Sequence, residues 1–299
     1  MKKYDIGIIG CGVAGMTAAI YLKRAGFSCI IFEGSVPGGQ IISNGNIENY
    51  PGFSSIKGTD LALSILNQVL ALKIDIIYSK VKDILLQDGK KQIVSEKETV
   101  LVDKIILATG RIPRMLGVPG EEKFRAKGIS YCAICDGALY KDKNVIVIGG
   151  GDSAIEATIY LSNLVKQVTL IHRKDTYRAK KYLLDRMKEL ENIHYLKGEV
   201  KEFRGKDKLE KVILKDGEEL SIDGAFIMIG QVPNTKFYES LSLELDDNYF
   251  AVDENYETSI KGIYAIGDCI KKESYQIVIA MGEAAKCAIH ISKESSHHE

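Results

Sequence analysis

Two cysteines separated by two residues form the part of the sequence best suited to redox chemistry. Cys132 and Cys135 lie in the segment Tyr131–Gly137, directly before Asp136. This spacing lets the two sulfurs bond across one turn, and the carboxylate of Asp136 can shuttle the proton that thiol exchange requires. Asp136 could otherwise cap a helix.

A zinc site is the main alternative for such a cysteine pair. It needs four ligands, but the sequence has no second pair of neighbouring cysteines and only five histidines, two of them in the polar tail. We therefore expect no metal, and a dithiol–disulfide couple is favoured over two unrelated structural cysteines. The remaining cysteines are expected to be small buried side chains: Cys11, Cys29, Cys269 and Cys287.

A glycine-rich turn follows the first apolar strand. The strand 4–9 leads into a G-x-G-x-x-G motif formed by Gly10, Gly12 and Gly15, and after a helix a second strand ends at Glu33. A strand, this turn and a helix at this length are typical of a dinucleotide site, because glycines let the backbone approach a pyrophosphate. The pyrophosphate then meets N–H groups at the start of the helix.

The same plan returns later in the chain. Gly10 and Glu33 are 23 positions apart, as are Gly149 and His172. The strand 144–148 leads into the second turn, whose residues are expected to contact a second dinucleotide: Gly149, Gly151, Asp152, Ser153 and Ala154.

Each copy also has a later partner strand. The segments 103–113 and 223–233 carry Asp, Gly and Pro at identical offsets, ending in Gly-x-x-Pro. The repeat predicts two related dinucleotide-binding domains.

The end of the second strand lies beside the adenosine ribose, and its charge separates the two sites. Glu33 can accept hydrogen bonds from ribose hydroxyls, which suits FAD or NAD. The second copy has His172, Arg173 and Lys174, with Arg178 nearby. These cations suit a 2′-phosphate and favour NADPH over NADH. A solvated basic loop is the alternative reading.

We predict an α/β fold with two Rossmann-like, three-layer dinucleotide-binding domains, the second inserted in the first. Gly267-Asp268 follows a strand, and the helix after it must return to the first domain, where its N-terminus can stabilise a reduced flavin. The expected FAD-binding domain is 1–112 with 245–299. The expected NADPH-binding domain is 113–244 and carries the cysteine pair.

The charge balance argues against some partners. Lys+Arg and Asp+Glu number 40 each, so a general nucleic-acid or membrane-surface binder is not expected. No apolar run approaches the roughly 20 residues that span a bilayer. The first residues lead directly into a strand and lack a leader pattern, so the expected location is the cytoplasm.

Over nearly its whole length the chain resembles the low-molecular-weight thioredoxin reductases of bacteria and archaea, in class II of the pyridine nucleotide-disulfide oxidoreductases. The matching motifs are the first G-x-G-x-x-G, Gly38-Gly39-Gln40, Glu48-Asn49-Tyr50-Pro51-Gly52, Ala108-Thr109-Gly110, Cys-x-x-Cys-Asp-Gly, Gly-Gly-Gly-Asp-Ser-Ala, His-Arg-Lys-x3-Arg and the terminal Gly-Asp.

The resemblance implies an enzyme that moves electrons from NADPH through FAD to the cysteine pair and on to thioredoxin or a thioredoxin-like protein. It implies that Cys135 lies next to the flavin, that Cys132 attacks the partner disulfide, that Asp136 is the acid/base, and that the enzyme is a homodimer. Further FAD contacts are implied for Gly38, Gly39, Gln40, Asn49, Thr109, Gly110, Gly267, Asp268, Gln276 and Ile277.

The sequence departs from the family pattern at several positions. Lys174 stands where an Arg is frequent, which removes bidentate pairing. Tyr275 stands where many members carry Arg, and Ala138-Leu139 where some carry Phe. The alternatives are a ferredoxin-fed or NADH-preferring flavoprotein disulfide reductase of the same fold, or a non-catalytic nucleotide-binding redox sensor. The intact second glycine-rich turn argues against the ferredoxin-fed alternative, whose members have lost the NADPH motifs.

Overall fold

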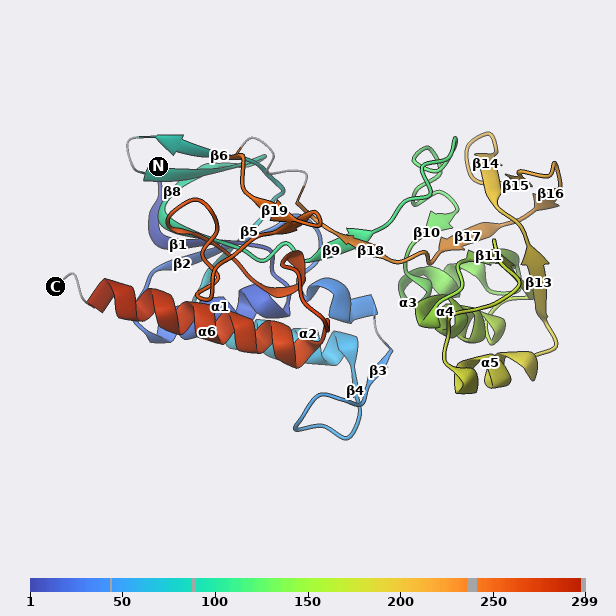
Figure 1. Ribbon diagram of the computed structural model, residues 1–299, viewed down its shortest axis with the longest axis horizontal. Coiled ribbons are helices and arrows are strands. Elements are labelled where there is room, and N and C mark those ends of the chain that lie inside the picture. Colours follow the sequence, from blue (N-terminus) through green and yellow to red (C-terminus); the bar gives the residue numbers. More distant parts are fainter. Residues whose placement is uncertain (44, 88–89, 236–240, 297–299) are drawn as a thin grey trace. The chain divides into compact units, whose positions relative to one another are not determined.

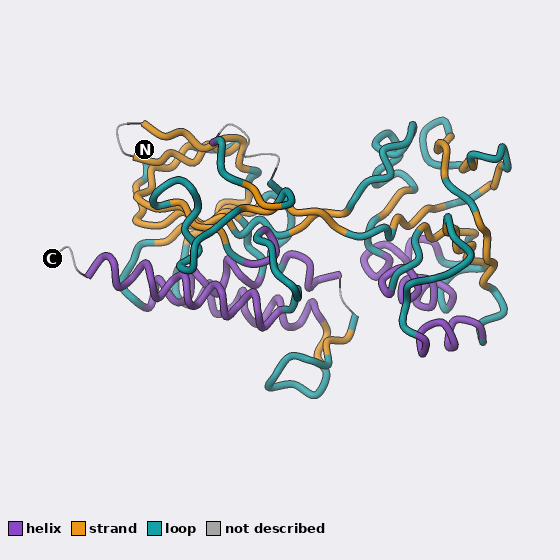
Figure 2. Tube along the Cα trace, in the orientation of Figure 1, coloured by secondary structure: helices purple, strands orange, loops and turns teal. Residues whose placement is uncertain are grey.

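The computed structural model describes residues 1–43, 45–87, 90–235 and 241–296, and it divides the chain into two compact units (Figure 1). Unit 1 comprises residues 1–112 and 233–299, and unit 2 comprises residues 113–232. Figure 2 shows helices and strands in both. The predicted fold class, two α/β units with the second inserted in the first, is confirmed.

Unit 1 is built on one sheet with the order β5-β2-β1-β8-β7-β6, in which β21 also pairs with β8. Its parallel strands are rich in apolar residues, as expected for strands covered on both faces. They are β5 (Asp75–Tyr78), β2 (Cys29–Glu33), β1 (Lys3–Ile9), β8 (Thr99–Leu107) and β21 (Ile263–Ala265). An antiparallel extension is formed by β7 (Lys90–Ser95) and β6 (Val81–Gln87).

Three helices pack on one face of this sheet: α1 (Val13–Arg24), α2 (Gly58–Ala71) and α6 (Ile277–Ser296) (Figure 1). Fully buried side chains such as Ile8 and Met16 form the core between the sheet and the helices, together with Cys287 and Ile291 from α6. A second core on the other face includes Phe250. The C-terminal segment therefore completes unit 1, as the sequence predicts.

Unit 2 repeats the plan with a fully parallel sheet of order β10-β17-β11-β12-β13. Helices cover one face and a small antiparallel sheet covers the other, so the unit has three layers. The parallel strands are β10 (Ile129–Ser130), β17 (Gly224–Ile227), β11 (Asn144–Ile148), β12 (Gln167–His172) and β13 (Ile193–Lys197). The helices are α3 (Ala133–Asp136), α4 (Asp152–Ser162) and α5 (Lys181–Lys188), and the small sheet is β14 (Val200–Arg204), β15 (Lys211–Leu214) and β16 (Glu219–Ser221).

The second chain crossing differs from the expected boundary at 244, because the structure places it between 232 and 233. The N–H of Asn234 donates to Gly110 O at 3.1 Å, and Leu241 and Leu243 are buried in the second core of unit 1. The described residues 233–235 and 241–244 are therefore held by unit 1. The crossing strands β9 (Arg111–Pro113) and β18 (Gln231–Pro233) pair with each other.

Helix α5 begins at Lys181, after a segment that is bound to the second glycine-rich turn. The N–H of Arg178 donates to Gly150 O at 2.8 Å, and the N–H of Lys180 donates to Asp152 Oδ1 at 2.8 Å. These bonds hold the segment before α5 against the glycine-rich turn and outside the helix.

Short elements connect the larger ones in both units. They are β3 (Asn46–Ile47), β4 (Ile56–Lys57), β19 (Leu245–Asp246), β20 (Tyr249–Phe250) and the 3-10 turns η1 (Gly39–Ser43), η2 (Gly137–Tyr140) and η4 (Gly267–Cys269). In the described part of the chain, every helix is too short or too polar to cross a membrane.

The central position of β1 predicts a large stability cost for truncating Ile8, which is fully buried. Ile8→Ala should lower the free energy of unfolding by about 2–5 kcal/mol, because it removes transfer energy and leaves a cavity. Leu86→Ala, at a side chain of β6 that is 47% exposed, is the control and should stay within about 0.5 kcal/mol of the wild type. Urea unfolding measures both, and equal losses would contradict this packing.

Candidate functional site

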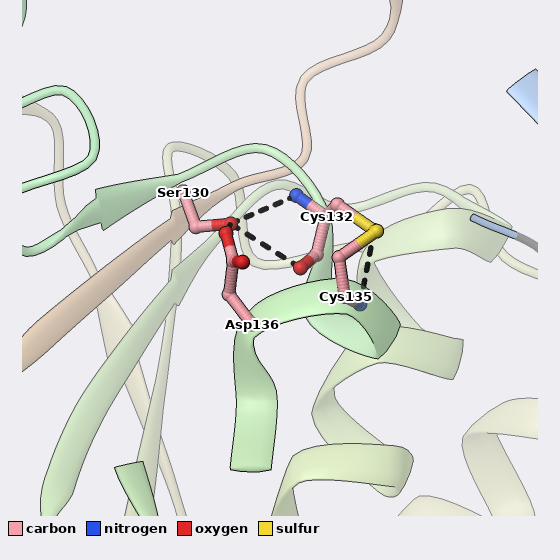
Figure 3. The surroundings of a disulfide bond; sticks show 4 residues. All are labelled: Ser130, Cys132, Cys135 and Asp136. Carbon is pink, nitrogen blue, oxygen red and sulfur yellow. Dashed lines mark hydrogen bonds between the residues drawn. A yellow bond between two sulfur atoms is a disulfide. The ribbon is translucent and has the colours of Figure 1, made fainter. Parts of the chain in front are cut away.

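Cys132 and Cys135 form a disulfide in unit 2, with Cα atoms 5.4 Å apart, as the spacing predicts (Figure 3). Cys132 precedes α3, and the N–H of Cys135 donates to Cys132 Sγ at 3.1 Å. A donor at this sulfur would stabilise negative charge on Cys132 once the bond is reduced. Cys135 is the more exposed residue of the pair, and Cys132 is half-buried.

Asp136 is bound to a serine. Its carboxylate Oδ2 accepts a hydrogen bond from Ser130 Oγ at 2.6 Å (Figure 3). Asp136 makes no side-chain cap for the turn that follows it, so the alternative role as a helix cap is wrong. Sequence reasoning missed Ser130, although its place two residues before Cys132 was a usable signal.

The other four cysteines are buried free thiols, as expected. Burial raises the pKa of Cys11, Cys29 and Cys287 to about 12 and that of Cys269 to about 11. These thiols therefore stay neutral at physiological pH and are poor nucleophiles. Among the described residues, no three His, Cys, Asp or Glu side chains cluster as a metal site would require.

The first glycine-rich turn has two glycines required by the fold and one that faces open space. A Cβ on Gly10 would lie 2.3 Å from Ala108 O, and one on Gly15 would lie 2.0 Å from Gly10 O. A Cβ on Gly12 would meet only Gly39 Cα, at 3.9 Å. No side chain caps the start of α1. The turn is thus a cradle at a helix start that no side chain caps, which fits a pyrophosphate.

Glu33 lies at the end of β2, close to this turn. Its Oε2 accepts the N–H of Cys11 at 2.9 Å and its Oε1 accepts the N–H of Ser35 at 2.7 Å. Gly38 reaches the same turn, because its N–H donates to Cys11 O at 2.8 Å. Each carboxylate oxygen keeps a lone pair for a ribose hydroxyl.

Several predicted FAD contacts that lie far apart in the sequence meet in unit 1. Asn49 Nδ2 donates to Gln276 Oε1 at 2.9 Å, directly before Ile277 begins α6. A Cβ on Gly110 would lie 3.7 Å from the Gln40 amide nitrogen, and a Cβ on Gly39 3.1 Å from Gly12 Cα. Thr109 Oγ1 donates to Asn234 O at 3.1 Å, which holds the segment beside Gly110.

The turn Gly267-Asp268 is held by charged residues that the sequence analysis did not single out. Arg111 Nη2 donates to Asp268 Oδ2 at 3.1 Å, and its guanidinium lies 3.9 Å from the centre of the Tyr275 ring. Glu283 Oε2 accepts the N–H of Gly267 at 3.1 Å and also binds Lys272 Nζ at 2.5 Å. The available signal for Glu283 was its place as the one acidic residue in the mostly apolar stretch 277–289 of α6.

The second glycine-rich turn has the same steric pattern in unit 2. A Cβ on Gly149 would lie 2.3 Å from Met228 O and 2.8 Å from the Ala154 Cβ, whereas a Cβ on Gly151 would meet nothing within 4 Å. No side chain caps the start of α4, and Ser153 in its first turn is exposed. This turn also fits a pyrophosphate.

The predicted cations gather at this turn. A Cβ on Gly150 would lie 2.4 Å from the His172 ring. Burial, together with the charges of Arg173, Arg178 and Lys174, lowers the pKa of His172. All three cations therefore lie close enough to the His172 imidazole to affect its charge. Their side chains are exposed and available to a ligand.

Asp152 begins α4 and forms an ion pair with Lys180 at 3.5 Å. Sequence reasoning missed Lys180, which adds a further positive charge beside the second turn.

A family model for the pyridine nucleotide-disulphide oxidoreductases matches residues 4–284. A thioredoxin reductase from Mycoplasma genitalium is 42% identical over 296 residues, covering 96% of this chain and 94% of the relative. The crystal structure of Lactococcus lactis thioredoxin reductase matches with a TM-score of 0.86 and 37% identity, over 97% of this chain and 98% of that one. The crystal structure of T. acidophilum thioredoxin reductase matches with a TM-score of 0.85 and 36% identity, over 99% of each chain.

Variants of Gly12 and Gly15 should distinguish an effect on FAD binding from an effect on folding, because only Gly12 faces open space. Gly12→Ala should fold but bind little FAD, because its Cβ would fill the space for the pyrophosphate. Gly15→Ala should instead destabilise the apoprotein, since its Cβ would lie 2.0 Å from a backbone oxygen. Flavin absorbance per protein and thermal unfolding of the apoproteins measure the two effects. Full FAD content in Gly12→Ala would refute the assignment of this turn to the FAD pyrophosphate.

Proposed function

The chain belongs to the pyridine nucleotide-disulphide oxidoreductase family, and on this basis we propose that it is a thioredoxin reductase. It takes electrons from NADPH, passes them through FAD to the Cys132–Cys135 disulfide, and reduces thioredoxin or a thioredoxin-like protein. One observation carries the proposal: a disulfide with a carboxylate one residue away lies in the same unit as a basic dinucleotide turn.

FAD would be held by unit 1, residues 1–112 with 233–299. The turn Gly10–Gly15 would bind its pyrophosphate, and Glu33 would accept hydrogen bonds from its ribose. Asp268 and the start of α6 would bind the flavin end. The chemistry supplied by FAD at this site is two-electron transfer from NADPH to the disulfide.

NADPH would be held by unit 2, residues 113–232. The turn Gly149–Gly151 and the start of α4 would bind the pyrophosphate. Arg173, Lys174 and Arg178 would bind the 2′-phosphate, because cationic side chains form charge-assisted hydrogen bonds with it.

The reduced cysteine pair would act as a dithiol. The Cys132 thiolate attacks one sulfur of the partner disulfide and forms a mixed disulfide, while the second partner sulfur leaves as a thiolate. The Cys135 thiolate then attacks Cys132 Sγ, which restores the internal disulfide and releases the first partner sulfur. Asp136 carries protons between the cysteine thiols and the leaving thiolates. The dithiol is oxidised by two electrons, and the partner disulfide is reduced to two thiols.

We also propose a homodimer in the cytoplasm. Exposed apolar side chains on unit 1, including Tyr21, Phe53 and Leu63, support an interface between two copies. Four cysteines that remain free thiols support a reducing compartment.

The basic cluster predicts discrimination between the two nicotinamide cofactors. Arg173→Glu with Lys174→Glu should raise the KM for NADPH by about tenfold or more and leave that for NADH nearly unchanged, because the charged 2′-phosphate is present only in NADPH. The double variant Lys206→Glu with Lys208→Glu, at exposed positions of the same unit, is the charge-matched control. Equal increases in KM for NADPH and NADH would contradict the assignment of Arg173 and Lys174 to the 2′-phosphate.

The two cysteines should be distinguishable, and this tests the proposed function. Both Cys132→Ser and Cys135→Ser should abolish NADPH-dependent reduction of thioredoxin. Only Cys135→Ser should accumulate a mixed disulfide, because it keeps the attacking Cys132 and lacks the resolving thiol. Non-reducing electrophoresis and mass spectrometry detect the adduct.

Cys29→Ala, which changes a buried cysteine in β2, is the control and should retain turnover. Adduct formation in Cys132→Ser alone would reverse the roles of the two cysteines. Turnover without either cysteine would rule out the proposed function.

A further inference from the structure

The hydroxyl of Ser130 lies among three polar groups of the disulfide segment (Figure 3). Ser130 ends β10 and is only 5% exposed. Its Oγ lies 2.6 Å from Asp136 Oδ2, 3.0 Å from the N of Cys132 and 3.2 Å from the O of Cys132. One buried hydroxyl thus joins Asp136 to the backbone of Cys132.

These partners satisfy the hydroxyl whether Asp136 is charged or neutral. A hydroxyl donates one hydrogen and accepts at two lone pairs. Beside a charged carboxylate, Ser130 donates to Asp136 Oδ2 and accepts the N–H of Cys132. Beside a protonated carboxyl, it accepts from Asp136 and from the N–H of Cys132, and its own hydrogen turns to the carbonyl of Cys132. Neither state leaves a buried donor without an acceptor.

Figure 3 shows where this bond holds the carboxyl group. Asp136 lies on the Ser130 side of the Cys132 backbone, and the two sulfurs lie on the other side. The bond uses Oδ2, so Oδ1 remains available for exchanging a proton, either directly or through a water molecule. Asp136 can therefore stay bound to Ser130 while it gains and loses a proton.

We propose that Ser130 is a positioning residue that keeps Asp136 beside Cys132 in both of its charge states. The proposal rests on the proposed function, in which Asp136 takes a proton from a cysteine thiol and gives it to the thiolate leaving the partner disulfide. When Asp136 gains the proton at Oδ1, Oδ2 still accepts the Ser130 hydrogen. When the proton is on Oδ2, Ser130 Oγ accepts it and the Ser130 hydrogen turns to Cys132 O. No other bond changes at Ser130.

A double-mutant cycle on the full-length, FAD-loaded protein tests the coupling. Ser130→Ala should lower kcat for thioredoxin reduction by about tenfold and leave KM for thioredoxin unchanged, because proton transfer depends on the position of the acid. Ser130→Thr, which keeps the hydroxyl, should restore kcat to within about twofold. In the Asp136→Asn background, Ser130→Ala should change kcat by less than about twofold, because the residue that it positions is already lost.

Ser162→Ala is the matched control. Ser162 is also buried, at 8% exposed, and its Oγ donates to Ile159 O at 2.7 Å within α4. This variant removes one buried serine hydroxyl from the same unit and should keep kcat at the wild-type value. A kcat loss as large in Ser162→Ala as in Ser130→Ala would assign the effect to general destabilisation and overturn the proposal.

A second measurement does not depend on turnover. Selective labelling with ¹⁵N-cysteine reduces the amide spectrum to the cysteines, and the Cys132 signal is assigned by its loss in Cys132→Ser. Hydrogen exchange at the Cys132 amide should be about tenfold faster in Ser130→Ala than in the wild type, since the N–H loses its acceptor. Ser162→Ala should leave this rate unchanged.

The two measurements separate the possible failures. Unchanged exchange at the Cys132 amide in Ser130→Ala, or fully additive kcat losses in the cycle, would overturn the role of Ser130. If the wild type reduces no thioredoxin, the proposed function fails, and the same cycle is run with a small aromatic disulfide as the acceptor. Coupling between Ser130 and Asp136 in that assay would still support the positioning role.

Discussion

Two backbone carbonyl groups, those of Ala108 and Met228, set the geometry on which both units depend. Ala108 directly follows β8 and Met228 directly follows β17, each beside the strand that leads into the glycine-rich turn of its unit. A Cβ on Gly10 or Gly149 would lie 2.3 Å from the corresponding carbonyl oxygen. Both glycines also have positive φ, +110° and +152°. The strand that leads into each turn can reach its helix only where a side chain is absent, and this explains why a glycine occupies the same place in both copies of the repeat.

The turns share this constraint, but the charge beside them differs. Glu33 places a carboxylate at the end of β2, with both oxygens bound to backbone N–H groups. At the corresponding position His172 has a lowered pKa, because it is partly buried and faces Arg173, Arg178 and Lys174. The imidazole is therefore neutral near pH 7, and the three cations supply the positive charge. Two turns with the same steric requirement thus suit ligands of different charge.

The sequence predicted the features that depend on local pattern. The strand Asn144–Ile148 begins and ends where expected, because its apolar run stops at a glycine. The sequence pattern placed the domain boundary wrongly, at 244, and it did not identify Ser130 and Glu283 as site residues. The boundary depends on side chains buried by distant strands, and the two residues matter through bonds to Asp136 and Gly267 that exist only after folding. Their places in the sequence mark both residues as candidates, but no spacing rule gives the groups to which they bind.

The insertion of residues 113–232 into unit 1 also bears on the order of folding during synthesis. Unit 2 is one continuous stretch, so it can close as soon as it leaves the ribosome. The first 112 residues cannot, because α1 packs against α6, and β8 pairs with β21 near the end of the chain. Until those segments emerge, one helix surface and part of a strand edge remain uncovered. Unit 1 is therefore the first to be started and the last to be completed. The nascent chain is most exposed to aggregation while residues 113–232 are being synthesised.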